Sequence, residues 1–193
     1  MPGLRFPAHG RWNRHLAVNL LEIPTWTAGG ALHAVVETPR GSSAKLKYEP
    51  DLGAFVLERP LAAGIRYPFD WGFFPGTLAA DGDPLDVMIL HDTATHPGLV
   101  IRCDALAVLR VTQNRKSGRG RERNDRVIAA PRGEAFASRA LLLGQRLRRE
   151  LEQFFRSAVL LEKKDVRFTG WGRAWEAEAI VRKAQRKFET QGE

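Results

Sequence analysis

Short segments in which apolar and polar residues alternate fill the first two thirds of the chain, and helical spacing appears only in the last third. Alternation with a period of two is typical of half-buried strands, and short apolar runs between turn residues are typical of buried strands. The alternating segments are residues 32–39, 45–50 and 53–60. The apolar segments are residues 87–92, 126–131 and 99–113, the last long enough for one bent strand or two. The pattern predicts a β-rich first part.

Two helices with a short strand between them are predicted in the last third. One runs from about Glu134 to Val159, where apolar residues recur three or four apart: Ala140, Leu143, Leu147, Leu151, Phe154 and Ala158. The other covers residues 173–188, with the apolar stripe Ala177, Ile180, Val181, Ala184 and Phe188. Residues 165–171 are the strand-like piece between them. Strands first and helices last indicate the α+β class, a compact β-barrel or curled sheet with helices packed outside.

The chain is predicted to form one domain over residues 1–193, because 44% hydrophobic and 27% charged residues is a normal globular balance. Residues 1–30, broken by prolines and glycines, are expected to be an irregular N-terminal extension, and residues 113–125 an exposed basic loop. No apolar run is long enough to cross a membrane, and the first residues lack a signal-peptide layout. With a single cysteine, Cys103, we expect a reducing, cytoplasmic setting.

The formal net charge of +8 makes polyanions candidate partners. The basic residues are scattered over the N-terminal part, the segment from Arg115 to Arg126 and the predicted helices. Zinc-finger spacing, a basic zipper and an RNA-recognition signature are absent from the sequence. The distribution favours a solvated basic surface or a small phosphate ligand over a nucleic-acid site.

The sequence Asp-Gly-Asp-Pro-Leu-Asp, residues 81–86, gathers three carboxylates directly before an apolar run. In an extended chain Asp81 and Asp83 point to the same side. Carboxylates held this close either share protons at raised pKa or bind cations, and hard oxygen ligands suit Mg²⁺, Mn²⁺ or Ca²⁺. An EF-hand loop is excluded, because Asp86 stands where that loop needs a glycine. A solvated Asp-Gly turn stays open as the alternative, although it does not account for Asp86.

The acidic segment and the residues before it resemble the signature region of the soluble family I inorganic pyrophosphatases. Residues 66–87 read RYPFDWGFFPGTLAADGDPLDV. The family has Tyr-Pro-x-x-Tyr-Gly-Phe-x-Pro-x-Thr-Leu, followed by Asp-Gly-Asp-Pro-x-Asp-Val. The similarity extends over most of the chain, since VVETPRGSSAKLKYE (35–49), FVLERP (55–60), the helix with FF and the closing GW also match.

The resemblance implies a five-stranded OB-like barrel with additional strands and two C-terminal helices packed outside. It also implies hydrolysis of pyrophosphate to two phosphates that depends on Mg²⁺, with Mn²⁺ as an alternative metal. The protein would be a homo-oligomer, and a membrane partner is not expected. The metal-binding positions would be Asp81, Asp86, Asp83 and Glu37, and Asp83 would act as general base. Tyr67 would be a second catalytic side chain that donates a hydrogen bond. The substrate-binding positions would be Lys47, Arg59, Tyr67 and Arg126, with Glu49 in a supporting position.

Two further metal-binding aspartates of the family are absent from the matching positions. Gln113 and Asn124 stand in their places, and Arg126 stands in the place of the lysine that follows. Asn and Gln carbonyls can bind Mg²⁺ but contribute no charge. The neighbouring Asp125 would compensate if the register slipped by one residue.

The family's phosphate-binding Tyr-Lys pair is also absent, because Ala158 and Val159 stand there, and Trp71 replaces a usual tyrosine. The chain instead carries a basic loop with Arg115, Lys116, Arg119, Arg121 and Arg123. Either these side chains neutralise the substrate in place of metal ions or they form a solvated loop.

Three functions are compared on this basis, and the preferred one is a divergent Mg²⁺-dependent pyrophosphatase. The second is a catalytically weakened relative that binds phosphate or metal, or acts on another phosphoanhydride. The third is a nucleic-acid module that uses the basic loop. It is disfavoured because carboxylates beside the only clustered aromatic residues would repel a phosphate backbone unless metals intervene.

Overall fold

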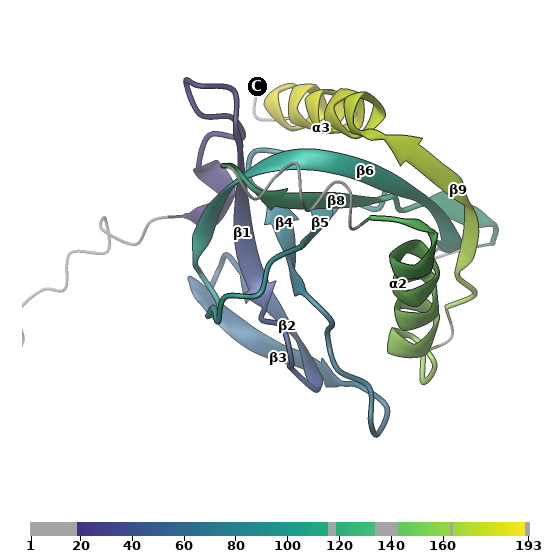
Figure 1. Cartoon of the computed structure of the whole chain (residues 1–193). Helices are drawn as coiled ribbons and strands as arrows, with labels where there is room; N and C mark the ends of the chain where they lie inside the picture. The colour runs from purple at the N-terminus through teal and green to yellow at the C-terminus, as the bar shows by residue number, and fades with distance from the viewer. Residues whose placement is uncertain (1–18, 116–118, 134–142, 163, 192–193) are drawn as a thin grey trace, which may run out of the picture.

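Five strands form a closed ring in the computed structural model, which describes residues 19–115, 119–133, 143–162 and 164–191 (Figure 1). The ring strands are β1 (Leu32–Thr38), β4 (Asp70–Phe74), β5 (Leu85–Ile89), β8 (Arg126–Pro131) and β6 (Val100–Asn114). They pair in the order β1-β4-β5-β8-β6, and β6 pairs back to β1. All of these pairings are antiparallel except β5–β8, which is parallel. The ring confirms the predicted five-stranded barrel.

Four further strands among the described residues extend or flank the ring. β2 (Ala44–Glu49) and β3 (Ala54–Pro60) form a separate antiparallel hairpin, as their alternation predicted. β7 (Arg121–Arg123) and β9 (Arg167–Arg173) both pair with β6. The prediction of a fully irregular basic loop was therefore wrong over β7. The long β6 continues past the ring to Asn114, and its free backbone groups there bind a returning strand.

Strand β4 was not predicted, because its residues Asp70–Phe74 are all buried and show no alternation. Gly72 lies at its centre and faces Val36 of β1. A Cβ atom at this position would lie 1.8 Å from the backbone oxygen of Val35, so only glycine permits the close pairing of β4 with β1.

Two α-helices lie outside the ring, α2 (Gln145–Ala158) and α3 (Ala174–Glu189), and a 3-10 helix, η2 (Leu20–Glu22), precedes β1. Figure 1 shows α3 along β6 and α2 beside β9. The first helix was predicted to start near Glu134, but residues 134–142, with Ala140, lie outside the described ranges, and the described helix begins at Gln145. Over the described ranges, the helices are all too short or too polar to cross a membrane.

Alternate residues of the ring strands supply two hydrophobic cores. In β5, Val87 and Ile89 pack in the cluster that α3 completes through Ala177, Val181 and Ala184. Met88, between them, packs in the second cluster, which α2 completes. The α2 residues of that cluster are Leu151, Phe154, Phe155 and Ala158. The predicted helix stripes thus pack in the cores. Several residues of the second cluster also line the site described next.

Candidate functional site

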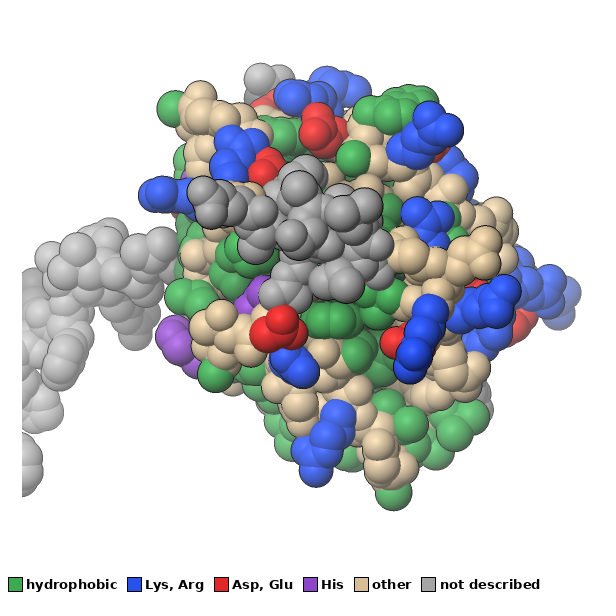
Figure 2. All heavy atoms as spheres, in the orientation of Figure 1, with side chains coloured by type: hydrophobic (Ala, Val, Ile, Leu, Met, Phe, Trp, Pro, Cys, Tyr) green, Lys and Arg blue, Asp and Glu red, His purple; other side chains and the backbone are tan. Residues whose placement is uncertain are grey.

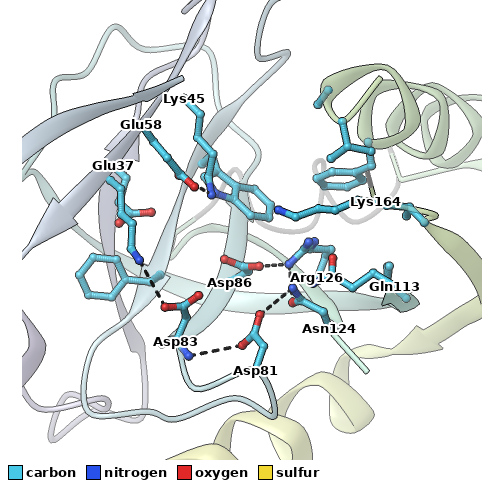
Figure 3. A pocket seen from close by; sticks show the side chains of 18 of the residues that line it. Glu37, Lys45, Glu58, Asp81, Asp83, Asp86, Gln113, Asn124, Arg126 and Lys164 are labelled. Atoms are coloured by element: carbon cyan, nitrogen blue, oxygen red, sulfur yellow. Dashed lines mark hydrogen bonds and ion pairs between the residues drawn. The ribbon is translucent and has the colours of Figure 1, made fainter. Parts of the chain in front are cut away.

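One pocket brings together every residue that the sequence assigned to metal, proton transfer or substrate (Figure 3). It lies between the β2–β3 hairpin, the start of β5, the end of β6, the start of β8 and the end of α2, and it is partly open to solvent. The predicted residues that line it are Glu37, Lys47, Arg59, Tyr67, Asp81, Asp83, Asp86, Gln113, Asn124 and Arg126. Glu49, expected in a supporting position, is not among the lining residues. The roles of these residues stay predictions, but their convergence is a finding.

The three aspartates enter the pocket from one tight turn and the strand after it. Asp81 and Asp83 belong to the turn before β5, in which Gly82 has a φ of 87°, a conformation that favours glycine. The backbone nitrogen of Asp83 donates to a carboxylate oxygen of Asp81 over 3.4 Å. Asp86 lies in β5 opposite Phe73 of β4. The turn thereby holds the carboxylates at the mouth of the barrel.

Each of these aspartates has a polar partner from another part of the chain, as Figure 3 shows. The Lys47 ammonium lies 3.3 Å from Asp83 Oδ1, and the amide of Asn124 donates to Asp81 over 2.8 Å. Asp86 forms an ion pair with Arg126. The negative charge of the turn is therefore compensated by side chains of the protein itself.

The donor set fits a divalent cation by its chemistry, because the three aspartates and Glu37 supply hard oxygen ligands to one pocket. In the part of the chain that the structure describes, however, no three acidic, histidine or cysteine side chains gather closely enough to hold one ion. Lys47 and Arg126 each contact one oxygen of these carboxylates, so they compete with a bound cation for Asp83 and Asp86.

Glu37 is a buried carboxyl group at the edge of the pocket, with 8% of its surface exposed. It accepts a hydrogen bond of 2.9 Å from the backbone nitrogen of Tyr48. Burial raises the pKa of Glu37 to about 7, although this hydrogen bond and the nearby lysines favour the ionised form. Near neutral pH, Glu37 is therefore divided between its protonated and ionised forms.

Tyr67 lies deep in the pocket wall and is 4% exposed. Its ring packs edge-on against Phe154, with 5.0 Å between the centroids, and against Trp71. Burial raises the pKa of the Tyr67 hydroxyl above its ordinary value. The hydroxyl therefore stays protonated at neutral pH and can donate a hydrogen bond.

Arg126 is a cation at the centre of the site, with 13% of its side chain exposed. Besides its ion pair with Asp86, it donates to the side-chain Oδ1 of Asn124 over 2.5 Å, and its guanidinium lies 5.2 Å from the ring centroid of Trp71. Burial lowers the pKa of Arg126 to about 10, while Asp81 acts in the opposite direction. The guanidinium remains charged at neutral pH, and its planar shape suits both the stack and the carboxylate.

The register deduced for the departing positions places Gln113 and Asn124 at the pocket. Asp125 does not line it. Its buried carboxylate accepts a hydrogen bond of 3.1 Å from the backbone nitrogen of Val111 and pairs with Arg123. The alternative in which Asp125 replaces a missing aspartate is therefore wrong, because that side chain is used to hold β8 and β6 together.

The basic loop does not reach the site in its described part. Arg115, Arg119, Arg121 and Arg123 are absent from the pocket lining, and Lys116 lies outside the described residues. Arg121 pairs with Asp165 over 2.8 Å, and Arg123 pairs with Asp125. The described arginines of this loop therefore do not line the pocket, and their interaction with the substrate stays a prediction. Figure 2 shows one face of the molecule, on which basic side chains lie in separate groups with acidic side chains among them.

Sequence reasoning missed three charged residues that line the pocket, Lys45, Glu58 and Lys164. Lys45 and Glu58 form a 2.7 Å ion pair across the β2–β3 hairpin. The alternation of β2 places Lys45 on the same face as Lys47, a signal that the sequence contains. No comparable signal marks Lys164, which follows α2 and joins the site only through the fold.

Comparison with known proteins identifies the family to which the chain is similar. The family model described as inorganic pyrophosphatase matches residues 34–189. The inorganic pyrophosphatase of Synechocystis is 36% identical over 158 residues, which cover 80% of this chain and 89% of that protein. The Thermus thermophilus enzyme is 35% identical over 160 residues, covering 79% of this chain and 88% of that protein.

Solved structures show the same similarity in three dimensions. The crystal structure of inorganic pyrophosphatase from Thermus thermophilus matches with a TM-score of 0.79 and 31% identity, over 89% of this chain and 99% of that one. The Helicobacter pylori inorganic pyrophosphatase matches with a TM-score of 0.73 and 27% identity, over 82% and 94%. Together with the pocket, these matches confirm the resemblance seen in the sequence: the chain belongs to the inorganic pyrophosphatase family.

Proposed function

We propose that this protein hydrolyses inorganic pyrophosphate to two phosphate ions, with Mg²⁺ or Mn²⁺ as its cofactor. The observation that supports this most directly is the convergence of three aspartates and several cations on one pocket, in register with the family's signature. Carboxylates alone would repel a phosphate, and cations alone would bind it without hydrolysis. A pocket with both can bind divalent metal and a polyphosphate together.

Asp81, Asp83, Asp86 and Glu37 would hold the divalent cations, with neutral help from the Asn124 and Gln113 side chains. Bound divalent cations lower the pKa of water and neutralise charge on phosphoryl oxygens. Because two family carboxylates are replaced by amides, this site binds metal with less negative charge than its relatives.

Asp83 is the proton acceptor in this proposal. Its side chain is 36% exposed, so water reaches it. As the water oxygen attacks phosphorus, Asp83 takes the proton that this oxygen loses. Lys47, 3.3 Å from Asp83, can move from the carboxylate to the phosphate as charge develops there.

The remaining cations bind the substrate and stabilise the leaving phosphate. Arg59 of β3 and Arg126 of β8 line the pocket, and the buried Tyr67 hydroxyl donates a hydrogen bond to the substrate. Guanidinium groups suit this role because their planar fork matches two phosphate oxygens. The protein is further expected to be a cytoplasmic homo-oligomer, as the resemblance implied.

A phosphate-release assay tests the proposal. Purified protein is given pyrophosphate, triphosphate or nucleotides with Mg²⁺ or Mn²⁺, and a chelator serves as the control. We expect phosphate release from pyrophosphate that depends on the metal and is lost with chelator. Metal-dependent binding of pyrophosphate in calorimetry without any turnover would instead identify a binding protein and contradict the proposed hydrolysis.

A further inference from the structure

One wall of the pocket lacks the phosphate donors that the resemblance led us to expect. Ala158 and Val159, at the end of α2, both line the pocket. Their side chains have no hydrogen-bond donor and no charge, so this wall cannot bind a phosphate oxygen through them.

A lysine that sequence comparison did not single out lies on the same wall. Lys164 lines the pocket from the segment between α2 and β9, and its side chain extends into the pocket in Figure 3. Its ammonium lies 2.8 Å from Glu162 Oε2 and remains 29% exposed, so it is both positioned and accessible.

Glu162 also holds Arg59, which the resemblance assigns to the substrate. The Arg59 Nε forms an ion pair with Glu162 Oε1 at 2.5 Å, although neither atom has a hydrogen bond of good geometry among the described residues. Lys164 contacts the other carboxylate oxygen. One carboxylate thus sets two cations side by side and leaves the trio with a net positive charge. Such an arrangement fits a multiply charged anion, which can be bound by both cations at once.

Trp71 contributes an independent observation on the same pocket. Its side chain is 4% exposed, and its indole N–H has no hydrogen-bond partner among the described residues. A buried donor without an acceptor is destabilising, and it is the kind of group that a ligand oxygen satisfies. Trp71 also stands at the sequence position where the resemblance has a tyrosine, so the side chain at this position still carries a hydrogen-bond donor.

We infer that Lys164 and the Trp71 N–H form a phosphate-binding subsite, in which Glu162 holds Lys164 beside Arg59. This subsite would bind the phosphate that the missing Tyr-Lys pair binds in the family. The inference rests on the proposed function for its substrate, but the binding of inorganic phosphate reports on the subsite without turnover. The ligand class is the phosphoryl group of pyrophosphate or its phosphate product.

The first test compares Lys164→Met with Lys183→Met, a matched removal of an exposed lysine on α3. For Lys164→Met we expect about tenfold weaker binding of inorganic phosphate in calorimetry with Mg²⁺, and a similar rise in KM with a smaller change in kcat. Lys164→Arg should stay close to wild type. If Lys164→Met binds phosphate as tightly as Lys183→Met, the subsite does not exist.

The second test moves the lysine back to the helix. In the double variant Val159→Lys/Lys164→Met, phosphate affinity should recover most of what Lys164→Met lost. A double variant as weak as the single one would contradict the idea that Lys164 substitutes for a lysine at position 159. Trp71→Phe, with folding checked by circular dichroism, should weaken phosphate binding severalfold, and unchanged binding would remove Trp71 from the subsite.

These measurements separate the two hypotheses. If wild-type protein binds phosphate through Lys164 but releases none from pyrophosphate, the subsite stands and the proposed hydrolysis fails. If it hydrolyses pyrophosphate and Lys164→Met changes neither KM nor phosphate binding, the hydrolysis stands and the subsite fails.

Discussion

Asp70 and the pocket aspartates lie at opposite ends of the same pair of strands and differ in exposure and in the partners of their carboxylates. Asp70 begins β4 and faces Ile89 of β5, whereas Asp86, in β5, faces Phe73 near the other end of β4. The two carboxylates therefore share one ladder, and their chemical difference comes from what surrounds them.

Asp70 is a structural carboxylate with 0% of its surface exposed. It accepts hydrogen bonds from His91 Nε2 (2.8 Å), the Thr95 hydroxyl (2.7 Å) and the backbone nitrogen of Arg40 (2.8 Å). Burial by itself would raise the pKa of Asp70, but these donors outweigh it and hold the pKa below the ordinary value. Every partner is fixed in place, so this carboxylate joins the loops at that end of the barrel.

The pocket aspartates are partly exposed and are compensated by long, flexible cations. Asp83 and Lys47 are each 36% exposed, and Asp86 is 21% exposed beside Arg126. The exposed Asp83–Lys47 pair contributes little to stability, so either side chain can exchange its partner for a metal ion, a proton or a phosphate. The comparison indicates that a carboxylate fully satisfied by rigid donors builds the fold, and one with exchangeable partners is available for chemistry.

The strongest test of this difference is the loss of a pocket carboxylate. Asp83→Asn and Asp86→Asn should each lower the rate of phosphate release by about 10²–10⁴-fold. The melting temperature of Asp83→Asn should change little, because its pair with Lys47 is partly exposed, whereas Asp86→Asn removes the charged partner of the largely buried Arg126 and should lower it. Asp51→Asn, an exposed substitution outside the pocket, is the control. Near-normal rates in Asp83→Asn would remove it from its role as proton acceptor.

The reverse result is expected for Asp70→Asn. Removing a charged acceptor from three buried donors should lower the free energy of unfolding by about 3 kcal/mol at neutral pH, measured by denaturant titration. Activity per folded molecule should be retained. A rate loss as large as that of Asp83→Asn, without a stability loss, would contradict the division into structural and functional carboxylates.

Acid should remove the stabilisation that Asp70 provides. Its pKa is lowered on folding, so the contribution is present above the unfolded value of 3.8 and is lost as pH falls through the folded value. Wild type and Asp70→Asn should therefore converge in stability at low pH, and a constant gap across pH would be the contrary result.

Glu37 should show the opposite pH dependence. Its pKa rises from 4.5 to about 7 on folding, so the folded state binds more protons than the unfolded state between these values. Stability should fall as pH rises through this window and level off above it, by about 3 kcal/mol in total. Glu37→Gln keeps the acceptor for Tyr48 and should remove this slope when melting is followed in chelator. A slope equal to that of wild type would show that Glu37 is ionised throughout.

Asn124→Asp should produce the smallest effect of these substitutions, and it should strengthen metal binding instead of weakening the site. It restores a carboxylate beside Asp81 and should tighten Mn²⁺ binding about tenfold, or about 1.4 kcal/mol, in calorimetry. Without metal, two like charges replace the 2.8 Å hydrogen bond, so the apoprotein should melt at a lower temperature. Unchanged metal affinity would mean that position 124 does not contribute a ligand.

Much of this protein was determined by local sequence. The alternation of β1, β2 and β3, the apolar runs of β5, β6 and β8, and the helix stripes predicted a barrel or curled sheet with two covering helices. The signature of residues 66–87, together with the resemblance over the rest of the chain, predicted the family and ten residues that line the pocket. These features are readable because periodicity and motif spacing are properties of neighbouring residues.

The tertiary structure alone decided the rest. β4 is buried on both faces and has no period, so only its pairing with β1 and β5 reveals it. The partners of charged groups, Arg126 for Asp86 and Glu162 for Arg59, come from distant segments. Charge is compensated by whichever group the fold brings within a few ångströms, and chain spacing carries no record of that distance.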